Sequence, residues 1–158
     1  METGVVFKEE QKFKQWWLWS IMAILNGVII FNLLNNAIKK NNNQTGMIIT
    51  AIIIVLITIF LYSIKLKTRI LKDSVEIIFF PFGIHKTYTL KNIEKIEVTK
   101  YNPFLEYGGW GIRIGAYTIS GNKGLKMYYA KDTYKDVILI GTQKPEELSK
   151  IIKHLKDA

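Results

Sequence analysis

The apolar residues of this chain are concentrated in two long stretches, residues 16–34 and residues 47–64. Neither stretch contains an Asp, Glu, Lys or Arg residue. As α-helices they would be about 27–28 Å long, close to the ~30 Å hydrocarbon core of a bilayer. A helix in the core of a soluble protein carries a polar stripe, which residues 51–62 lack. The pattern predicts two transmembrane helices; the alternative is a pair of buried strands, because Ile and Val favour sheets.

A polar segment rich in Asn, residues 35–46, separates the two stretches. A connection this short predicts an antiparallel hairpin over residues 16–64, flanked by an N-terminal segment (1–15) and a second domain (65–158). Basic residues lie mostly in the flanks: Lys8, Lys12, Lys14, Lys65, Lys67, Arg69 and Lys72, against Lys39 and Lys40 in the connection. The positive-inside rule then predicts a multi-pass plasma-membrane protein with both termini in the cytoplasm. The first stretch is too long for the apolar part of a signal peptide, and no small-residue cleavage site follows it.

Three residues of the first stretch are candidates for helix packing. The Asn26 amide is costly in lipid unless it faces a partner. Ala23 and Gly27 are spaced four apart, which lets another helix approach closely. Two interpretations stay open: packing against the second helix through Thr50 or Thr58, or contact with a second copy or another membrane protein.

The rest of the chain predicts short strands and then one helix. Turn residues separate segments with strand-like patterns at 66–71, 75–80, 84–89, 94–101, 110–119, 125–130 and 136–141. After Pro145, apolar residues recur at helical spacing: Leu148, Ile151, Ile152 and Leu155. The expected fold class is α+β, in which a seven-strand antiparallel β-barrel or sandwich follows the hairpin and an amphipathic C-terminal helix covers its open end.

The segment Tyr-Gly-Gly-Trp-Gly-Ile-Arg at 107–113, followed by Gly-Asn-Lys-Gly at 121–124, completes a resemblance. With the hairpin, the strands and the helix, it is similar to small bacterial membrane proteins of unknown function that carry a pleckstrin-homology-type (PH-like) domain. The resemblance covers about residues 66–156 and implies a PH-like binding module without catalytic residues. The familiar PH activity, phosphoinositide binding, usually needs a basic loop between the first two strands. The turn at 72–74 is short and contains an acid, so we expect no specific inositol-phosphate site.

The Gly/Trp segment and the residues before it are candidates for partner binding. Gly111 beside Trp110 predicts a bulge that bends the sheet; alternatively, Arg113 lies on the outer face and contacts an anion or a partner. Phe104 and Leu105 lie in an expected loop, where exposed apolar side chains favour docking to a partner or to the membrane surface.

A second candidate set is basic and follows the second stretch: Lys65, Lys67, Arg69 and Lys72. Basic residues near a membrane surface attract anionic lipid by about 1 kcal/mol each. The alternative is that these residues serve only to set the topology.

The amino-acid composition limits the kinds of site that this protein can form. The 158 residues carry a formal net charge of +9, and they include no Cys and two His. Disulfides, thiolate metal sites and Cys nucleophiles are thus excluded, and His85 and His154 cannot build a multi-histidine site. No motif for phosphate cradling, zinc hydrolysis or a serine nucleophile occurs. We therefore expect no enzyme activity, cofactor or metal. The dispersed basic residues, without a recognition helix, argue against nucleic acid.

The sequence favours a membrane-anchored PH-like binding or scaffold module. Its expected partners are the lipid bilayer and either a protein segment or an anionic membrane surface at the cytoplasmic face. The alternative is an accessory or structural subunit of a membrane complex, which acts mainly through its hairpin on a membrane-protein partner or a second copy.

Overall fold

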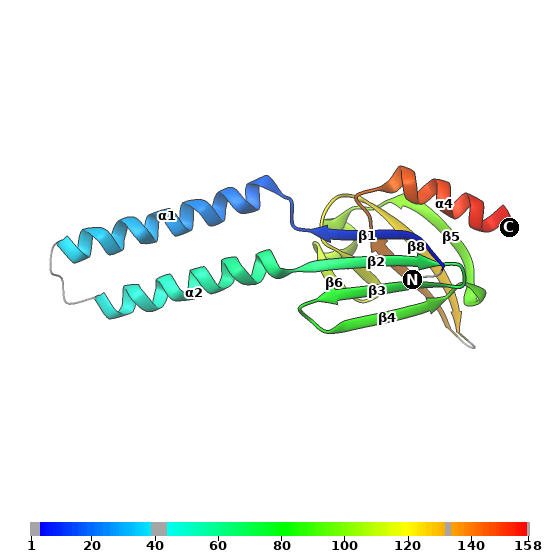
Figure 1. Cartoon of the computed structure of the whole chain (residues 1–158), viewed down its shortest axis with the longest axis horizontal. Helices are drawn as coiled ribbons and strands as arrows, with labels where there is room; N and C mark the ends of the chain where they lie inside the picture. The colour runs from blue at the N-terminus through cyan, green and yellow to red at the C-terminus, as the bar shows by residue number, and fades with distance from the viewer. Residues whose placement is uncertain (1–3, 39–43, 132–133, 158) are drawn as a thin grey trace. The chain divides into compact units, whose positions relative to one another are not determined.

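The computed structural model of this protein describes residues 4–38, 44–131 and 134–157, and it divides into two compact units. One unit is Lys14–Ser63, which contains helices α1 (Trp16–Ile38) and α2 (Gln44–Ser63). The other unit combines Met1–Phe13 with Ile64–Ala158 (Figure 1). The sequence analysis treated residues 1–15 as a separate N-terminal segment. In the structure, residues 4–13 instead fold with the residues that follow the hairpin.

The helical unit agrees with the predicted hairpin. Helices α1 and α2 are 23 and 20 residues long. The most apolar windows of the two helices are only 6% and 0% buried, whereas a core helix of a soluble protein is mostly buried. Two helices of membrane-spanning length and composition are thus confirmed. Lys39 and Lys40, the two basic residues that the sequence places in the connection between the helices, lie outside the described residues.

The β-rich unit contains two sheets. Four antiparallel strands form the first sheet in the order β1 (Val5–Lys12), β2 (Lys65–Leu71), β3 (Ser74–Phe80), β4 (Ile84–Thr89) (Figure 1). The second sheet has the order β5 (Ile93–Lys100), β8 (Lys123–Lys131), β9 (Tyr134–Gly141), β7 (Ala116–Thr118), β6 (Gly111–Arg113). A short 3-10 helix, η1 (Leu90–Asn92), joins the sheets. In the described ranges the strands number nine rather than the expected seven, and they form two open sheets rather than a closed barrel.

Strand β1 is the main difference from the expected fold. It is paired antiparallel with β2, and Lys12 lies opposite Lys65. The hairpin is thus inserted between two strands that are neighbours in one sheet. The inward residues of β1 are Phe7, Glu9 and Gln11, all buried. Because two of these three are polar, β1 lacks the apolar alternation by which sequence patterns identify a strand.

The expected strand at 110–119 is two short strands joined by a turn. Strand β6 pairs with β7, and β7 then lies parallel to β9, so the second sheet is not wholly antiparallel. Gly115 makes the turn with φ of +71°, and a Cβ there would lie 2.6 Å from the Val137 carbonyl oxygen. Only glycine fits this position without a shift of the backbone.

Helix α4 (Pro145–Asp157) lies against β5 and β1 and turns Leu148 and Ile152 into the core. This confirms the predicted amphipathic helix. The largest fully buried apolar side chains come from both sheets, from the bend after β7 and from α4: Phe79, Leu66, Ile70, Ile77, Ile119, Leu125, Met127, Leu139, Ile140, Leu148 and Val75.

Candidate functional site

The predicted partner-binding loop contains a short capped helix, α3 (Pro103–Tyr107). The Asn102 side chain accepts hydrogen bonds from the backbone N–H groups of Phe104 and Leu105, each at 3.1 Å. Asn side chains stabilise a helix start in this way. The cap holds Phe104 and Leu105 in the solvent, where they are 61% and 86% exposed. Their partner-binding role stays a prediction.

Arg113 and Trp110 hold this loop together. The Arg113 guanidinium donates to the carbonyl oxygens of Tyr107 at 3.0 Å and Gly108 at 3.2 Å, at the end of α3. The Trp110 indole N–H donates to the Gly121 carbonyl at 2.9 Å, and its ring packs edge-on against Phe104 at 5.0 Å. Both side chains therefore stabilise the loop, and this favours a structural role for Arg113 over an anion contact.

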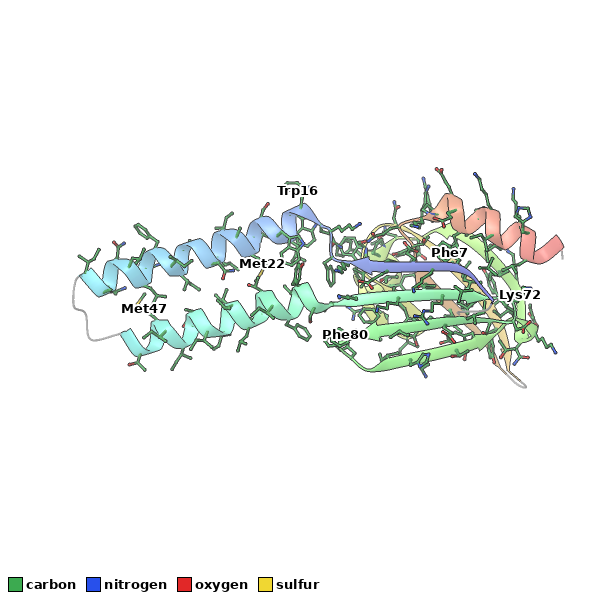
Figure 2. The ribbon with its side chains drawn as sticks, in the orientation of Figure 1. Phe7, Trp16, Met22, Met47, Lys72 and Phe80 are labelled. Atoms are coloured by element: carbon green, nitrogen blue, oxygen red, sulfur yellow. The ribbon has the colours of Figure 1, made fainter. Side chains whose placement is uncertain are left out.

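The four residues predicted to contact anionic lipid do not form one patch. Lys65, Lys67 and Arg69 alternate along β2, whereas Lys72 lies in the turn beyond the far end of that strand. Figure 2 shows Lys72 and Phe80, the partner of Lys65, at opposite ends of the sheet. Glu10 forms ion pairs with Lys65 at 3.8 Å and with Lys67 at 3.5 Å. This carboxylate offsets part of the positive charge at the end of β2 that adjoins the hairpin.

Of the candidate helix-packing residues, Asn26 faces the second helix. Its amide Nδ2 donates to the Met22 carbonyl at 2.7 Å and to the Thr58 hydroxyl at 3.1 Å. Ala23 and Gly27 are exposed, and a Cβ at Gly27 would meet no atom within 4 Å. Packing inside the hairpin thus involves Asn26 and Thr58, but not the small-residue pair.

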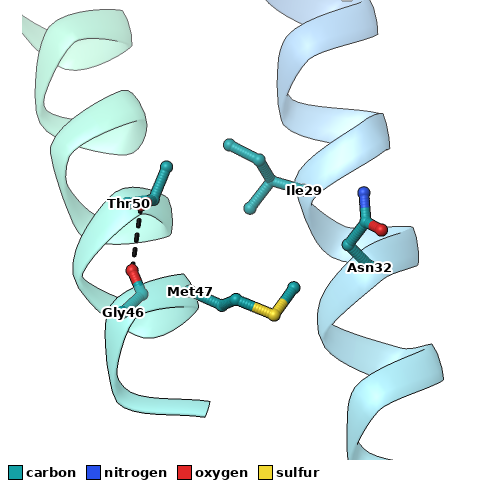
Figure 3. Close-up of a pocket in the computed structure, with 5 residues that line it drawn as sticks. All are labelled: Ile29, Asn32, Gly46, Met47 and Thr50. Carbon is teal, nitrogen blue, oxygen red and sulfur yellow. Dashed lines mark hydrogen bonds between the residues drawn. The ribbon is translucent and has the colours of Figure 1, made fainter. Parts of the chain in front are cut away.

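The helices also leave a hollow between them near the connection. It has a volume of about 270 Å³ and is lined by Ile29, Asn32, Gly46, Met47 and Thr50 (Figure 3). Thr50 donates to the Gly46 carbonyl of its own helix at 2.9 Å, so it is not the partner of Asn26.

A buried polar cluster joins β1 to the segment that connects β9 and α4. The Glu9 carboxylate accepts hydrogen bonds from the Thr142 hydroxyl and the Gln143 backbone N–H, both at 2.7 Å. The Gln11 amide donates to the Gly141 carbonyl. Glu9 and Gln11 are 5% and 0% exposed. The sequence analysis missed this cluster because its members are far apart in the sequence. Glu9 and Thr142, for example, are separated by 133 positions.

A tyrosine-lined cavity lies between β4 of the first sheet and the β7, β8 and β9 strands of the second. Its volume is about 610 Å³, and its lining includes Tyr88, Tyr117, Tyr129 and Asp136. The rings of Tyr88 and Tyr129 meet edge-on at 5.8 Å. Burial and a hydrogen bond with Tyr117 raise the pKa of Tyr88 well above its usual range. Its phenol stays neutral at physiological pH and can only donate or accept hydrogen bonds.

A basic groove lies between strand β5 and helix α4. It has a volume of about 430 Å³, and its lining contains Lys100, Lys123, Lys150 and Lys153 with a single acid, Glu146. Among the described residues none of these four lysines forms an ion pair. A mostly apolar hollow of about 230 Å³ lies between the same two elements. The sequence analysis missed this groove, since nothing local places Lys150 and Lys153 beside Lys100 and Lys123.

No three His, Asp or Glu side chains within 4–38, 44–131 and 134–157 gather as a metal site would require. Comparison with known proteins identifies no relative, because no family model, curated protein or solved structure matches this chain.

Proposed function

We propose that this protein is a membrane-anchored PH-like binding module, which recruits a protein segment at the cytoplasmic face of the plasma membrane. The observation that carries the proposal is the insertion of an uncharged hairpin between the paired strands β1 and β2 of a unit with a basic groove, whose lysines form no ion pair among the described residues. The hairpin restricts the binding unit to the membrane plane, which raises its effective concentration for membrane partners.

Strand β1 supports an anchor rather than a cleaved leader. Cleavage after α1 would remove β1 together with Phe7, Glu9 and Gln11, which are buried in the β-rich unit. The pairing of β1 with β2 also supports a hairpin whose two ends lie on the same side of the membrane. The lysines and Arg69 near those ends support the cytoplasmic side.

The order of the strands supports the PH-like assignment. Without the short β6–β7 hairpin, the second unit consists of seven strands (β1 to β5, β8 and β9) followed by α4. The resemblance implies the same number of strands and the same C-terminal helix. The seven strands are not the expected ones, however, because β1 takes the place of the strand expected at 110–119.

The contacts favour a protein partner over an anionic membrane surface. Glu10 offsets Lys65 and Lys67, and Lys72 lies at the other end of β2. The basic groove lies elsewhere, between β5 and α4.

Two measurements on intact cells and membranes test the anchor. We expect the chain to stay in the membrane after carbonate extraction, and we expect the β-rich unit to resist protease added outside the cells. Release by carbonate would contradict the anchor, and digestion from outside would contradict the cytoplasmic location.

The exposed pair Ala23 and Gly27 favours a second candidate, an accessory subunit that binds another membrane protein through its hairpin. A Cβ at Gly27 would meet no neighbouring atom within 4 Å, so Gly27→Leu adds bulk to that surface at a position with open space around the backbone. Loss of partner capture in Gly27→Leu, with Phe104→Ala unaffected, would favour this candidate over the binding module.

A further inference from the structure

The tyrosine-lined cavity between β4 and the second sheet has the size and the lining of a small-molecule site. Its volume of about 610 Å³ lies within the ~300–1,000 Å³ that is usual for such sites. The lining combines three tyrosines with three aliphatic residues, Ile114, Val137 and Ile138. The cavity shares no lining residue with the basic groove. It is therefore a candidate site of its own, beyond the binding function proposed above.

Two of the tyrosine rings form a corner in the cavity wall. The rings of Tyr88 and Tyr129 have their centroids 5.8 Å apart and their planes inclined at 74°. The Asn92 amide donates to the Tyr129 hydroxyl at 3.0 Å, and the Tyr88 hydroxyl is hydrogen-bonded with Tyr117. Both rings are held in place before a ligand binds, which lowers the entropic cost of binding. Because the face of an aromatic ring attracts positive charge, such a corner suits a cation.

A carboxylate lies beside this corner. Asp136 is the cross-strand partner of Tyr129, so the two side chains lie on the same face of the second sheet. Burial is the main cause of the raised pKa of Tyr88, and the negative charge of Asp136 adds to it. Within the part of the chain that the structure describes, Asp136 forms no hydrogen bond or ion pair. Its charge is therefore available to a cation in the corner.

A lysine lines the same cavity. Lys86 and Tyr88 are two positions apart in β4, so their side chains leave the same face of the strand about 7 Å apart. Lys86 forms no ion pair with any described residue. The lining thus contains one base and one acid, Asp136. A ligand that satisfies both groups carries a cation and an anion on one short chain.

We propose that this cavity binds a small zwitterion that joins a methylated ammonium group to a carboxylate. The ammonium group occupies the corner between Tyr88 and Tyr129 beside Asp136, and the carboxylate pairs with Lys86. The ring faces favour a methylated ammonium over a primary one, because a primary ammonium brings N–H donors that would lack acceptor atoms there.

The test measures the binding of γ-butyrobetaine to the full chain by isothermal titration calorimetry. The chain is held in nanodiscs of phosphatidylglycerol, a lipid that has no ammonium group. Two analogues separate the charges of this probe: in one a quaternary carbon replaces the nitrogen, and in the other, butyltrimethylammonium, a methyl group replaces the carboxylate. We expect γ-butyrobetaine to bind at least about tenfold more tightly than either analogue.

Charge variants with matched controls assign the two ends of the site. Asp136→Asn and Lys86→Gln should each weaken the binding of γ-butyrobetaine at least about fivefold, because each removes one charge that faces the ligand. Asp73→Asn and Lys72→Gln make the same changes at residues outside the cavity, and they should leave the affinity within about twofold.

A pair of variants at one position tests the ring corner. Tyr129→Phe keeps the ring and should retain the affinity within about threefold, whereas Tyr129→Leu removes the ring and should lose at least about tenfold. An equal loss in the two variants would contradict the contact between the ring face and the cation.

No binding of γ-butyrobetaine, equal binding of either analogue, or unchanged affinity in Asp136→Asn and Lys86→Gln would overturn the proposal. Binding of phosphatidylcholine vesicles without binding of γ-butyrobetaine would overturn it in favour of a lipid headgroup. The anchor is tested separately by the carbonate and protease measurements, so failure of the zwitterion site and failure of the anchor are distinguishable.

Discussion

Glu9 shows how one residue connects segments at opposite ends of the chain. Its buried carboxylate accepts hydrogen bonds from Thr142 and Gln143, which follow β9. A buried carboxylate persists in a fold when such donors satisfy it. Glu9 therefore joins β1 of the first sheet to the segment that follows β9 of the second sheet.

Replacement of Glu9 by Ala should destabilise the protein by about 2 kcal/mol, because it leaves the buried Thr142 hydroxyl and the partly buried Gln143 N–H without this acceptor. Thermal unfolding of the full chain in detergent measures the change. Glu10→Gln is the matched control: Glu10 pairs with lysines while its side chain is 41% exposed, and we expect a loss below about 1 kcal/mol. An equal loss in both variants would contradict a special role for the buried cluster.

Tyr101 should make stability fall at high pH. Burial raises the pKa of its phenol to about 12, from the model-compound value of 10.0. The protonated form is thus favoured in the folded state, and this contribution is complete below pH 10 and is lost as pH rises from about 10 to about 12. In Tyr101→Phe, unfolding temperatures measured from pH 9 to pH 12 should fall less steeply than in the wild type. Parallel pH curves for the two proteins would refute the role of Tyr101.

At the scale of elements, the hairpin shows which polar residue joins its helices. Asn26 donates to Thr58 of α2, whereas Asn32 donates to the Val28 carbonyl of its own helix at 2.8 Å. The two residues are the same type in the same helix, so they form a matched pair for mutation.

We expect Asn26→Ala to weaken the hairpin by about 0.6–2 kcal/mol, the usual range for a hydrogen bond between transmembrane helices. Asn32→Ala removes no bond between the helices and should change stability by less than about 0.5 kcal/mol. Unfolding of the full chain with increasing dodecyl sulfate in mixed micelles compares them. A larger effect of Asn32→Ala would mean that the hollow in Figure 3, rather than the Asn26–Thr58 contact, determines the packing.

At the scale of the whole molecule, the hairpin is an insertion in a sheet. Lys12 and Lys65 are paired, so the strands on either side of the hairpin already lie at the spacing of a β-hairpin. Replacement of residues 14–63 by Asn-Gly leaves a four-residue connection, Phe13-Asn-Gly-Ile64, between this pair, and β-hairpin loops of two to five residues are usual. A chain in which Asn-Gly replaces residues 14–63 should therefore fold as a soluble β-rich unit.

The matched comparison is the fragment 64–158, which lacks β1. Removal of a buried Phe such as Phe7 alone costs about 3–5 kcal/mol, and a whole domain is stable by only about 5–15 kcal/mol. We expect dispersed amide signals by NMR from the Asn-Gly chain and not from the fragment. A folded fragment would show that β1 is dispensable.

Local patterns in the sequence were sufficient for the two apolar helices and for α4. Each depends on the composition or the period of one continuous segment: two long uncharged stretches, and apolar residues at helical spacing from Leu148 to Leu155. Most strands after residue 65 also follow from short alternating patterns and turn residues. The PH-like function and its partner remain predictions.

The tertiary structure decided what depends on distant residues. Strand β1 carries buried Glu9 and Gln11 in place of apolar residues, so only its pairing with β2 identifies it as a strand. The sequence left open whether Arg113 contacts an anion or a partner, and in the fold its guanidinium donates to the carbonyl groups at the end of α3. The basic groove brings together lysines from three elements, β5, β8 and α4. Sequence patterns report which face of an element is apolar, whereas chain topology determines which polar side chains meet.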